Sequence, residues 1–341
     1  MATSAPNVRE LPSPPTDTIS SVSFSPYSST RLIVPSWDGN IHLYDTYGSD
    51  GTGSKLAQIF HDTPVLSACY GDRDTEIFSG GLNFTVNTLD PENNTATAIG
   101  AHDDAVSAVC YNTSTRQLIT GSWDKSLHTY DPRTSSLTGE YIQPEKIFSM
   151  STVDHTLVIS MANRGISIYD LRNMSEPSQI RESSLKFQNR TVVCMPNGQG
   201  YATSSIEGRV AVEFLDPGEE SQARKFVFKC HRQVEGGVDV VYPVNALAFH
   251  PVYGTFASGG GDGVVSLWDG AAKIRLRQYQ KLGASIAGLS YNNEGRMLAI
   301  GTSAGFEGGQ TDGECPPESV RVIIREMPEG EGKGKVQEKR Q

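Results

Sequence analysis

Three side chains in the sequence, His102, Ser122 and Asp124, are of the types that form a serine-nucleophile triad. In hydrolases such a serine sits in a sharp Gly-x-Ser-x-Gly turn beside an oxyanion-binding motif, and neither surrounds Ser122. We therefore interpret the three residues as a buried hydrogen-bonded network that stabilises a turn. The sequence predicts that the protein is not an enzyme.

Cofactor and metal motifs are also missing from the sequence. The run Gly259–Gly263 resembles a phosphate-binding loop, but it lies between two predicted strands and opens no helix, so a hairpin turn explains it better. Five cysteines occur, and no two of them form a Cys-x-x-Cys pair. We predict no cofactor, no metal site and a reduced, intracellular chain.

Three cations, Arg190, Arg209 and Lys229, indicate binding of anions instead. They lie in residues 181–232, which hold eight Lys/Arg and six Asp/Glu (8 − 6 = +2), in a chain whose net charge is -10. Guanidinium and ammonium groups make charge-assisted hydrogen bonds with carboxylates and phosphates. The acidic remainder argues against direct binding of nucleic acid or of an anionic membrane.

A repeat must position these side chains. Six segments end in an apolar or aromatic residue followed by Asp, and successive pairs are 39 to 53 residues apart. That spacing is near the roughly 40–45 residues of a four-stranded propeller blade. The six pairs are Tyr44-Asp45, Leu89-Asp90, Tyr130-Asp131, Tyr169-Asp170, Leu215-Asp216 and Trp268-Asp269.

Alternating hydrophobicity within each period predicts strands, and a seventh unit covers residues 286–325. The outermost strand of this unit is missing, and Val8–Leu11 can supply it and close the ring. We predict an all-β, seven-bladed WD-repeat propeller with four-stranded antiparallel blades. Residues 1–326 would form this single domain, and the charged, Gly-rich residues 327–341 a disordered tail.

Alignment of the blades identifies positions that break the repeat. The first core position of the innermost strand holds Arg190 where the other six blades have a β-branched aliphatic residue. An acid-binding role would explain this arginine, and so would a local register shift or a surface salt bridge. The aliphatic residues are Ile19, Val65, Val106, Ile147, Val244 and Ile286.

The hairpin turn between the second and third strands shows further anomalies, which are Trp37, Trp123 and Arg209. In a propeller blade this turn shares one face with the start of the first strand and the end of the fourth. Lys229 ends the fourth strand of blade five and is expected on that face as well. Exposed aromatic residues beside arginine are typical of peptide-binding hot spots, although both indoles could instead pack against neighbouring loops.

No targeting or membrane segment is expected from the sequence. Residues 1–18 are polar and Pro-rich, without the apolar stretch of a signal peptide. No apolar run approaches the ~18 residues that a membrane-spanning helix needs.

Several tracts are similar to those of a known family, the spindle-checkpoint propellers called "budding uninhibited by benzimidazole three". The resemblance extends from about Leu11 to Arg325. Two loops, 233–241 and 304–319, depart from it. The tracts are Arg181-Glu-Ser-Ser-Leu-Lys-Phe-Gln-Asn-Arg190, Ser204-Ser-Ile-Glu-Gly-Arg-Val-Ala-Val-Glu213, Phe228-Lys-Cys-His-Arg232, Gln143-Pro-Glu-Lys-Ile147, Asp131-Pro-Arg-Thr134 and Tyr242-Pro-Val-Asn-Ala246.

The resemblance implies an adaptor that acts at kinetochores in mitosis and in the nucleus, as a monomeric propeller within hetero-complexes. It implies that Trp37, Trp123 and Arg190 bind a short acidic segment of Bub and Mad checkpoint kinases and pseudokinases. It also implies that Arg209 and Lys229 hold the phosphothreonine of Met-Glu-Leu-Thr repeats in the kinetochore scaffold, which recruits the kinases there.

The alternative is the sister propeller family of messenger-RNA export, which binds a related segment of a nucleoporin. That family shares the Glu-Ser-x-Leu-Lys tract. It departs from Val210-Ala-Val-Glu213 after the Gly-Arg pair and usually has a longer N-terminal extension, so the checkpoint family fits better.

Overall fold

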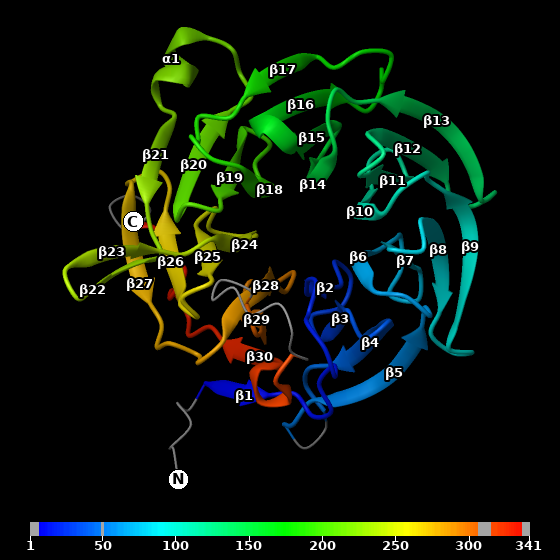
Figure 1. Ribbon diagram of the computed structural model, residues 1–341, viewed down its shortest axis with the longest axis horizontal. Helices are drawn as coiled ribbons and strands as arrows, with labels where there is room; N and C mark the ends of the chain where they lie inside the picture. Colours follow the sequence, from blue (N-terminus) through cyan, green and yellow to red (C-terminus); the bar gives the residue numbers. More distant parts are fainter. Residues whose placement is uncertain (1–6, 49–50, 306–314, 336–341) are drawn as a thin grey trace.

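The computed structural model describes residues 7–48, 51–305 and 315–335, and in these residues seven four-stranded antiparallel sheets form a closed ring (Figure 1). The predicted seven-bladed propeller is therefore confirmed. Blades one to four consist of β2 (Ser23–Phe24), β3 (Arg31–Pro35), β4 (Asn40–Asp45) and β5 (Ser54–Phe60); β6 (Val65–Tyr70), β7 (Ile77–Gly81), β8 (Thr85–Asp90) and β9 (Thr95–Ala101); β10 (Val106–Asn112), β11 (Gln117–Ser122), β12 (Ser126–Asp131) and β13 (Ser136–Ile142); and β14 (Ile147–Val153), β15 (Thr156–Met161), β16 (Gly165–Asp170) and β17 (Gln179–Glu182).

The remaining blades follow the same order from the central channel outward. They are β18 (Asn189–Cys194), β19 (Gly200–Ser205), β20 (Arg209–Phe214) and β21 (Phe226–Lys229); β24 (Val244–Phe249), β25 (Phe256–Gly260), β26 (Val265–Asp269) and β27 (Ile274–Gln278); and β28 (Ser285–Tyr291), β29 (Met297–Ser303), β30 (Arg321–Glu326) and β1 (Val8–Glu10). Outside the blades lie a two-stranded ribbon of β22 (Arg232–Glu235) and β23 (Val238–Val241), the helix α1 (Glu219–Ala223), and 3-10 turns at Ala162–Arg164 and Pro317–Ser319.

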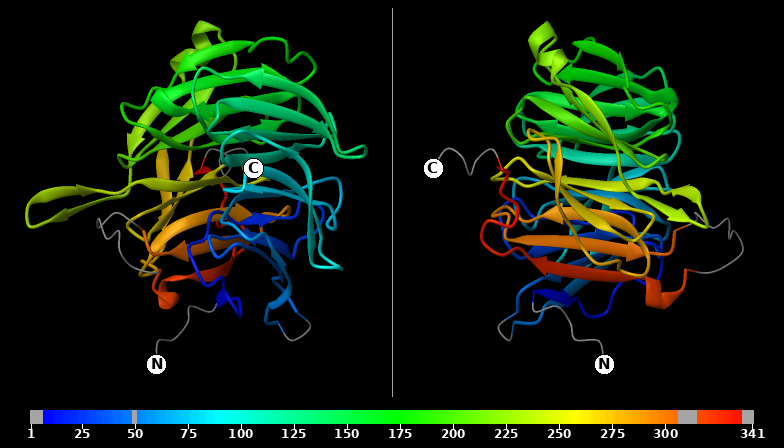
Figure 2. Two further views of the ribbon diagram at one scale, coloured as in Figure 1. Left: turned by 45° about the vertical axis from the view of Figure 1, so that its right-hand side comes forward. Right: turned by 90° about the vertical axis from the view of Figure 1, so that its left-hand side faces the viewer.

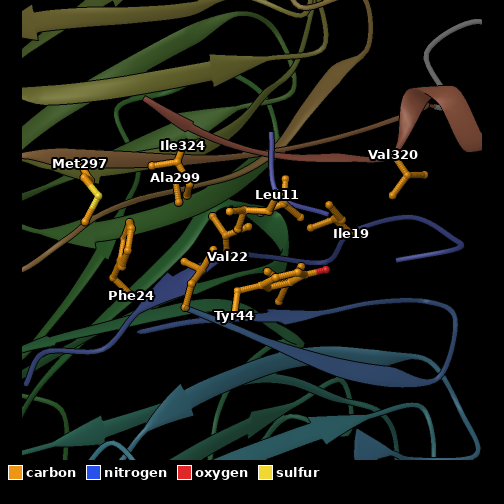
Figure 3. Close-up of a cluster of buried hydrophobic side chains, with 12 residues drawn as sticks. Leu11, Ile19, Val22, Phe24, Tyr44, Met297, Ala299, Val320 and Ile324 are labelled. Carbon is orange, nitrogen blue, oxygen red and sulfur yellow. The ribbon is translucent and has the colours of Figure 1, made fainter. Parts of the chain in front are cut away.

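The N-terminal strand closes the ring, as predicted. Strand β1 pairs antiparallel with β30, with Val8 opposite Arg325 and Glu10 opposite Ile323. The next residue, Leu11, is buried in an apolar cluster shared by blades seven and one (Figure 3). Burial of a leucine contributes roughly 1.5–3 kcal/mol, so this contact holds the two ends of the ring together.

The inner strands carry the apolar core between blades. All six aliphatic residues aligned with Arg190 in the sequence are at most 2% exposed. A side chain at Gly80 or Gly259 would lie 2.4 Å from the neighbouring blade's aliphatic residue, Val106 or Ile286. The blades are therefore packed closely enough that glycine is needed where two of them meet.

The expectation of a disordered tail does not hold for residues 327–335, whereas 336–341 lie outside the described residues. Glu331 is bound by Arg277 at 3.0 Å and Arg325 at 3.1 Å, and the Tyr279 hydroxyl donates to it at 2.7 Å. Met327 is buried at 8% exposure. These contacts fasten the segment across blades six and seven. In the described part of the chain, no helix is long and apolar enough to cross a membrane.

Candidate functional site

The predicted site residues all lie on one face of the ring, which we call the hairpin face. It is formed by the starts of the inner strands, the turns between second and third strands, and the ends of the outer strands. In blade five the strand register places these three features together, since Asn189 pairs with Ser205 and Arg209 pairs with Lys229. Arg190, Arg209 and Lys229 are therefore at the same end of one blade.

Arg209 and Lys229 are immediate neighbours. They are directly opposite each other across β20 and β21, and opposed side chains of an antiparallel pair point to the same side of the sheet. Lys229 is exposed and forms no ion pair with any residue that the structure describes. The pair can therefore present two positive charges to one anionic ligand.

An acidic side chain of the same turn, Glu207, contacts Arg209. The Arg209 Nε donates to Glu207 Oε2 at 2.6 Å, and the Arg232 Nη2 donates to Glu207 Oε1 at 2.6 Å. Partial burial acts to raise the pKa of Glu207, but hydrogen bonds from the two arginines outweigh it and lower the pKa. Glu207 is thus an ionised carboxylate bound between two guanidinium groups.

The predicted alignment of Arg190 with the aliphatic core residues is wrong by one position. Asn189, opposite Ser205, occupies the place that Val106 takes opposite Ser122. Arg190 follows at the irregular step of the strand, where it is exposed and donates from Nε to Asn245 Oδ1 at 3.2 Å. The exception therefore comes from the alignment, because β10 has the same irregular step after Val106, and Arg190 is a surface cation on the inner strand.

The two tryptophans differ in exposure. Trp37 is 41% exposed, whereas Trp123 is half-buried and its indole nitrogen has no hydrogen-bond partner among the described residues. Each occupies the same place in its turn, with its backbone N–H donating to the carbonyl of the residue before the first core position, which is Thr18 before Ile19 and Ala105 before Val106. The expectation of surface indoles is met in full at Trp37 and in part at Trp123.

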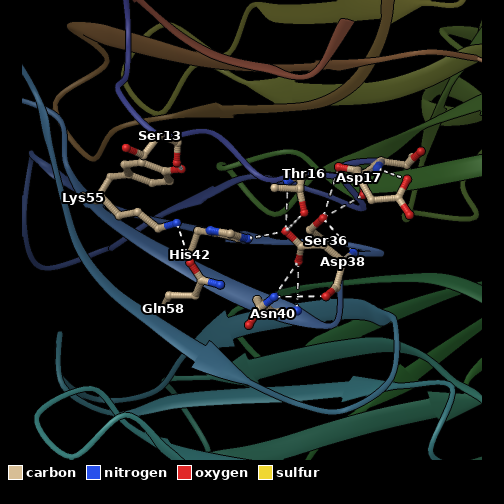
Figure 4. Close-up of polar contacts among 11 residues, drawn as sticks. Ser13, Thr16, Asp17, Ser36, Asp38, Asn40, His42, Lys55 and Gln58 are labelled. Carbon is tan, nitrogen blue, oxygen red and sulfur yellow. Dashed lines mark hydrogen bonds and ion pairs between the residues drawn. The ribbon is translucent and has the colours of Figure 1, made fainter. Parts of the chain in front are cut away.

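Polar contacts hold the turn that carries Trp37 (Figure 4). Asp38 contacts the His42 Nε2 at 2.9 Å and accepts from the backbone N–H of Asn40 and of Thr16, each at 3.0 Å. Burial acts to raise the pKa of Asp38, but hydrogen bonds from His42 and Thr16 outweigh it and lower the pKa to about 2. A fixed turn loses less conformational entropy when a ligand binds to it.

The predicted polar network in blade three is present, with different hydroxyl partners. His102 Nδ1 lies 2.6 Å from Ser126 Oγ, and His102 Nε2 lies 2.7 Å from Thr120 Oγ1. The Ser122 hydroxyl donates to the Asp104 carbonyl instead. Burial, with His128 nearby, lowers the pKa of His102 to about 4, so the ring is neutral near pH 7.

A related network stabilises blade six beside Lys229, and sequence reasoning missed it. His231 Nδ1 lies 2.9 Å from Asp262 Oδ1, and His231 Nε2 lies 2.8 Å from Ser258 Oγ. The Trp268 indole donates to the same serine at 2.8 Å. The Trp268-Asp269 pair was the sequence signal that could have located it, because the indole of a WD repeat is a buried donor that needs a partner.

Sequence reasoning also missed a groove between the outer strands of blades five and six. The residues that line this cavity of about 350 Å³ include Phe226, Phe228, Lys229, Trp268 and Ile274. Both phenylalanines are half-buried, while Val227 and Lys229 on the other side of β21 are exposed. The groove places an apolar surface next to a cation.

Further exposed apolar residues lie on the hairpin face of blades one to three. Phe60 ends β5 and is 64% exposed, Phe84 is in the turn before β8 and is 42% exposed, and Ile142 ends β13 and is 72% exposed. Large apolar residues gathered on one face mark protein interaction surfaces. The sequence signal was their place in the repeat, the same as that of the tryptophans and Lys229.

The chain is similar in sequence to several known proteins. The family model "WD domain, G-beta repeat" matches residues 6–45, 93–131 and 226–269. The chain is 48% identical to mitotic checkpoint protein BUB3.1 of Arabidopsis thaliana, over 98% of this chain and 97% of that protein. It is 42% identical to mitotic checkpoint protein bub3 of Dictyostelium discoideum, over 92% of this chain and 93% of that protein.

More distant likenesses support the same architecture. The poly(A)+ RNA export protein of Schizosaccharomyces pombe is 33% identical over 94% of this chain and 91% of its own length. The solved structure of U3-55K superposes with a TM-score of 0.78 at 16% identity, and the match covers 95% of this chain and 99% of that one. At this identity the superposition shows the propeller fold alone.

Proposed function

The chain belongs to the family of mitotic checkpoint propellers named BUB3, and from this premise we propose that it is a non-catalytic adaptor of the spindle assembly checkpoint. It binds an acidic segment of Bub and Mad checkpoint kinases and a phosphorylated kinetochore scaffold. By holding both it recruits the kinases to kinetochores, and it acts in the nucleus and on mitotic kinetochores as one propeller within hetero-complexes.

The observation that carries this proposal is the direct opposition of Arg209 and Lys229 on β20 and β21. A phosphothreonine carries about −1.5 to −2 charges and three acceptor oxygens. Arginine can donate two parallel hydrogen bonds to such a group, and lysine adds a second positive charge. An unmodified threonine forms none of these charge-assisted bonds, so phosphorylation would switch binding on.

The groove between blades five and six supports an apolar sequence around the phosphothreonine. Its lining includes Lys229 together with Phe226, Phe228 and Trp268. The Met and Leu side chains of a phosphorylated Met-Glu-Leu-Thr repeat can bury apolar area there, at roughly 25 cal/mol per Å². The phosphate would supply the switch, and the groove would supply part of the affinity.

The kinase segment is proposed to bind nearer the channel. Arg190 on β18 and Arg209 on β20 are two strand spacings apart, which is about 10 Å, so two ligands can bind side by side. Arg190 would pair with a glutamate of the acidic segment, while Trp37 and Trp123 offer the aromatic contact area that peptide-binding hot spots favour.

The geometry of the polar residues supports a role without catalysis. The Ser122 hydroxyl is bonded to the Asp104 carbonyl, and both ring nitrogens of His102 are occupied by Ser126 and Thr120. A general base needs a free nitrogen beside the nucleophile. The family resemblance points the same way, to a binding platform.

Titration of the protein with phosphorylated and unphosphorylated Met-Glu-Leu-Thr peptides, with and without the acidic kinase segment, tests the proposal. We expect the phosphorylated peptide to bind at least tenfold more tightly, and the kinase segment to bind without displacing it. Equal affinity for the two peptides would disprove phosphate recognition.

The messenger-RNA export role is the weaker alternative, because the export relative shares 33% identity against 48% for the checkpoint protein. The same titration distinguishes the two. Preferential binding of a nucleoporin segment, with no binding of the phosphorylated peptide, would favour the export role.

A further inference from the structure

A carboxylate already occupies the proposed phosphate site. Both oxygens of Glu207 are bound, one by Arg209 and the other by Arg232, each at 2.6 Å. The Glu207 side chain is 23% exposed, and those of Arg209 and Arg232 are 26% and 17% exposed. A phosphate that reaches Arg209 must therefore displace a bound carboxylate.

Arg232 reaches this site from the ribbon of β22 and β23, which projects from the ring beside blade six (Figures 1 and 2). It pairs opposite Val241, and its Nη1 lies 3.9 Å from Asp239 Oδ2 on the second strand. A Cβ at Gly208, the residue after Glu207, would lie 2.9 Å from Val241 Cγ1. The base of the ribbon is thus packed on the turn that carries Glu207.

We propose that Arg232 is a positioning residue of the phosphate site, which keeps Glu207 bound while a phosphate takes its place on Arg209. This inference rests on the proposed function and adds two residues to it. Glu207 lowers the affinity for phosphopeptide because it binds Arg209. Arg232 reduces this loss of affinity because it binds the Glu207 carboxylate after the phosphate has displaced it.

The pattern of contacts explains why the exchange is possible. Glu207 uses different oxygens for the two arginines, so breaking its bond to Arg209 leaves its bond to Arg232 in place. Without Arg232, the displaced carboxylate would be unpaired beside a phosphate, and like charges at such short range repel. Glu207 would then remain on Arg209 and exclude the ligand.

Four proteins test this inference by fluorescence titration with a phosphorylated Met-Glu-Leu-Thr peptide: the wild type, Glu207→Gln, Arg232→Ala and the double variant. Glu207→Gln should bind about fivefold more tightly, because an ion pair at the surface is worth up to about 1 kcal/mol. Arg232→Ala should bind roughly fivefold more weakly. The double variant should recover the affinity of Glu207→Gln, because position 207 then has no carboxylate that could compete with the phosphate for Arg209.

The double variant distinguishes positioning from direct contact. If Arg232 itself bound the phosphate, its loss would weaken binding equally with and without Glu207, and the inference would be wrong. Unchanged or weaker binding by Glu207→Gln would also overturn it, and this variant keeps the size of the side chain, so its fold is expected to be intact. Thermal unfolding of each variant shows whether its fold is intact.

Glu182→Gln is the matched control. Glu182 pairs with Arg164 in blade four, at the same end of the ring, and the substitution removes the same charge. It should leave the affinity within twofold of wild type, and a gain equal to that of Glu207→Gln would reduce the effect to overall charge and overturn the inference. Failure of the wild type to bind the phosphopeptide would instead disprove the proposed function itself.

Discussion

Blades three and five use polar residues in opposite ways. In blade three the His102 side chain is fully buried and both of its nitrogens are bonded to hydroxyls of its own blade. In blade five the cations lie at the surface, where Arg190 and Lys229 are exposed. Blade three keeps its histidine in an internal network, whereas blade five departs from the repeat where it would bind ligands.

The difference shows how to assign a role to a polar residue in a repeat protein. A polar side chain that recurs between blades and is buried with partners stabilises the fold. One that breaks the pattern and stays accessible is available for recognition. The two classes should therefore respond differently to substitution, in stability for the first and in affinity for the second.

The largest effect is expected in blade three, for His102→Ala. The substitution removes one hydrogen bond from each of the Thr120 and Ser126 hydroxyls, and it removes the ring that stacks on His128, 3.9 Å away between centroids. The lost hydrogen bonds and the cavity should lower the free energy of unfolding by roughly 3 kcal/mol. Urea denaturation measures this loss, and phosphopeptide affinity should stay unchanged in the folded protein.

The pH dependence of stability provides the control. The pKa of His102 is about 4 in the folded protein and about 6.5 in an unfolded chain. Between these values the unfolded chain binds the proton and the folded one does not, so stability is present above pH 6.5 and falls as the pH drops towards 4, by roughly 3 kcal/mol. The His102→Ala curve should fall less steeply, and parallel curves would contradict the assignment.

The repeat and its closure could be predicted from the sequence because they depend on local patterns. Alternating apolar residues identify strands, and a seventh blade with three strands requires a fourth from elsewhere in the chain, which β1 provides. The placement of Arg209 and Lys229 on one face followed from the same reasoning, since a turn and the end of the next strand meet at one end of a blade, and the structure adds that the two residues are directly opposite each other.

Features that depend on irregular or tertiary contacts could not be predicted. Asn189 takes the buried position at the start of β18 that an aliphatic residue holds in the other blades, so Arg190 lies one position further on, and a polar residue at a core position gives no signal in the apolar alternation. The segment around Glu331 has the composition of a disordered tail, and tertiary contacts such as those with Arg277 and Arg325 hold it in place. Arg232 joins the site through the packing of a ribbon that has no counterpart in the other blades as far as the structure describes them.

Arg209→Ala tests the accessible residues of blade five, where a substitution should affect affinity and not stability. It should weaken phosphopeptide binding by about 1.5–3 kcal/mol, the value of a hydrogen bond to a charged group. The free energy of unfolding should change by less than about 1 kcal/mol, because partly exposed ion pairs contribute little to stability. Isothermal titration and urea denaturation of the same samples measure both quantities.

Arg133→Ala is the matched control for this substitution. Arg133 pairs with Asp131 at the far end of blade three and is 73% exposed, so its loss should alter neither affinity nor stability measurably. If Arg209→Ala weakened binding of the unphosphorylated peptide as much as that of the phosphorylated one, Arg209 would have the structural role that we assign to His102.

The smallest effect is expected for Arg190→Ala, which tests whether blade five holds two separate sites. Arg190 is on the inner strand and bonds to Asn245 of blade six, whereas Arg209 and Lys229 are on the outer half of the blade. Loss of one exposed cation should weaken binding of the acidic kinase segment by about 1 kcal/mol and leave phosphopeptide affinity unchanged. Titration of the variant with each ligand alone measures the two effects. Equal weakening of both ligands would mean that the three cations form one continuous anion site, because a charge that serves only the inner ligand cannot alter the affinity of the outer one.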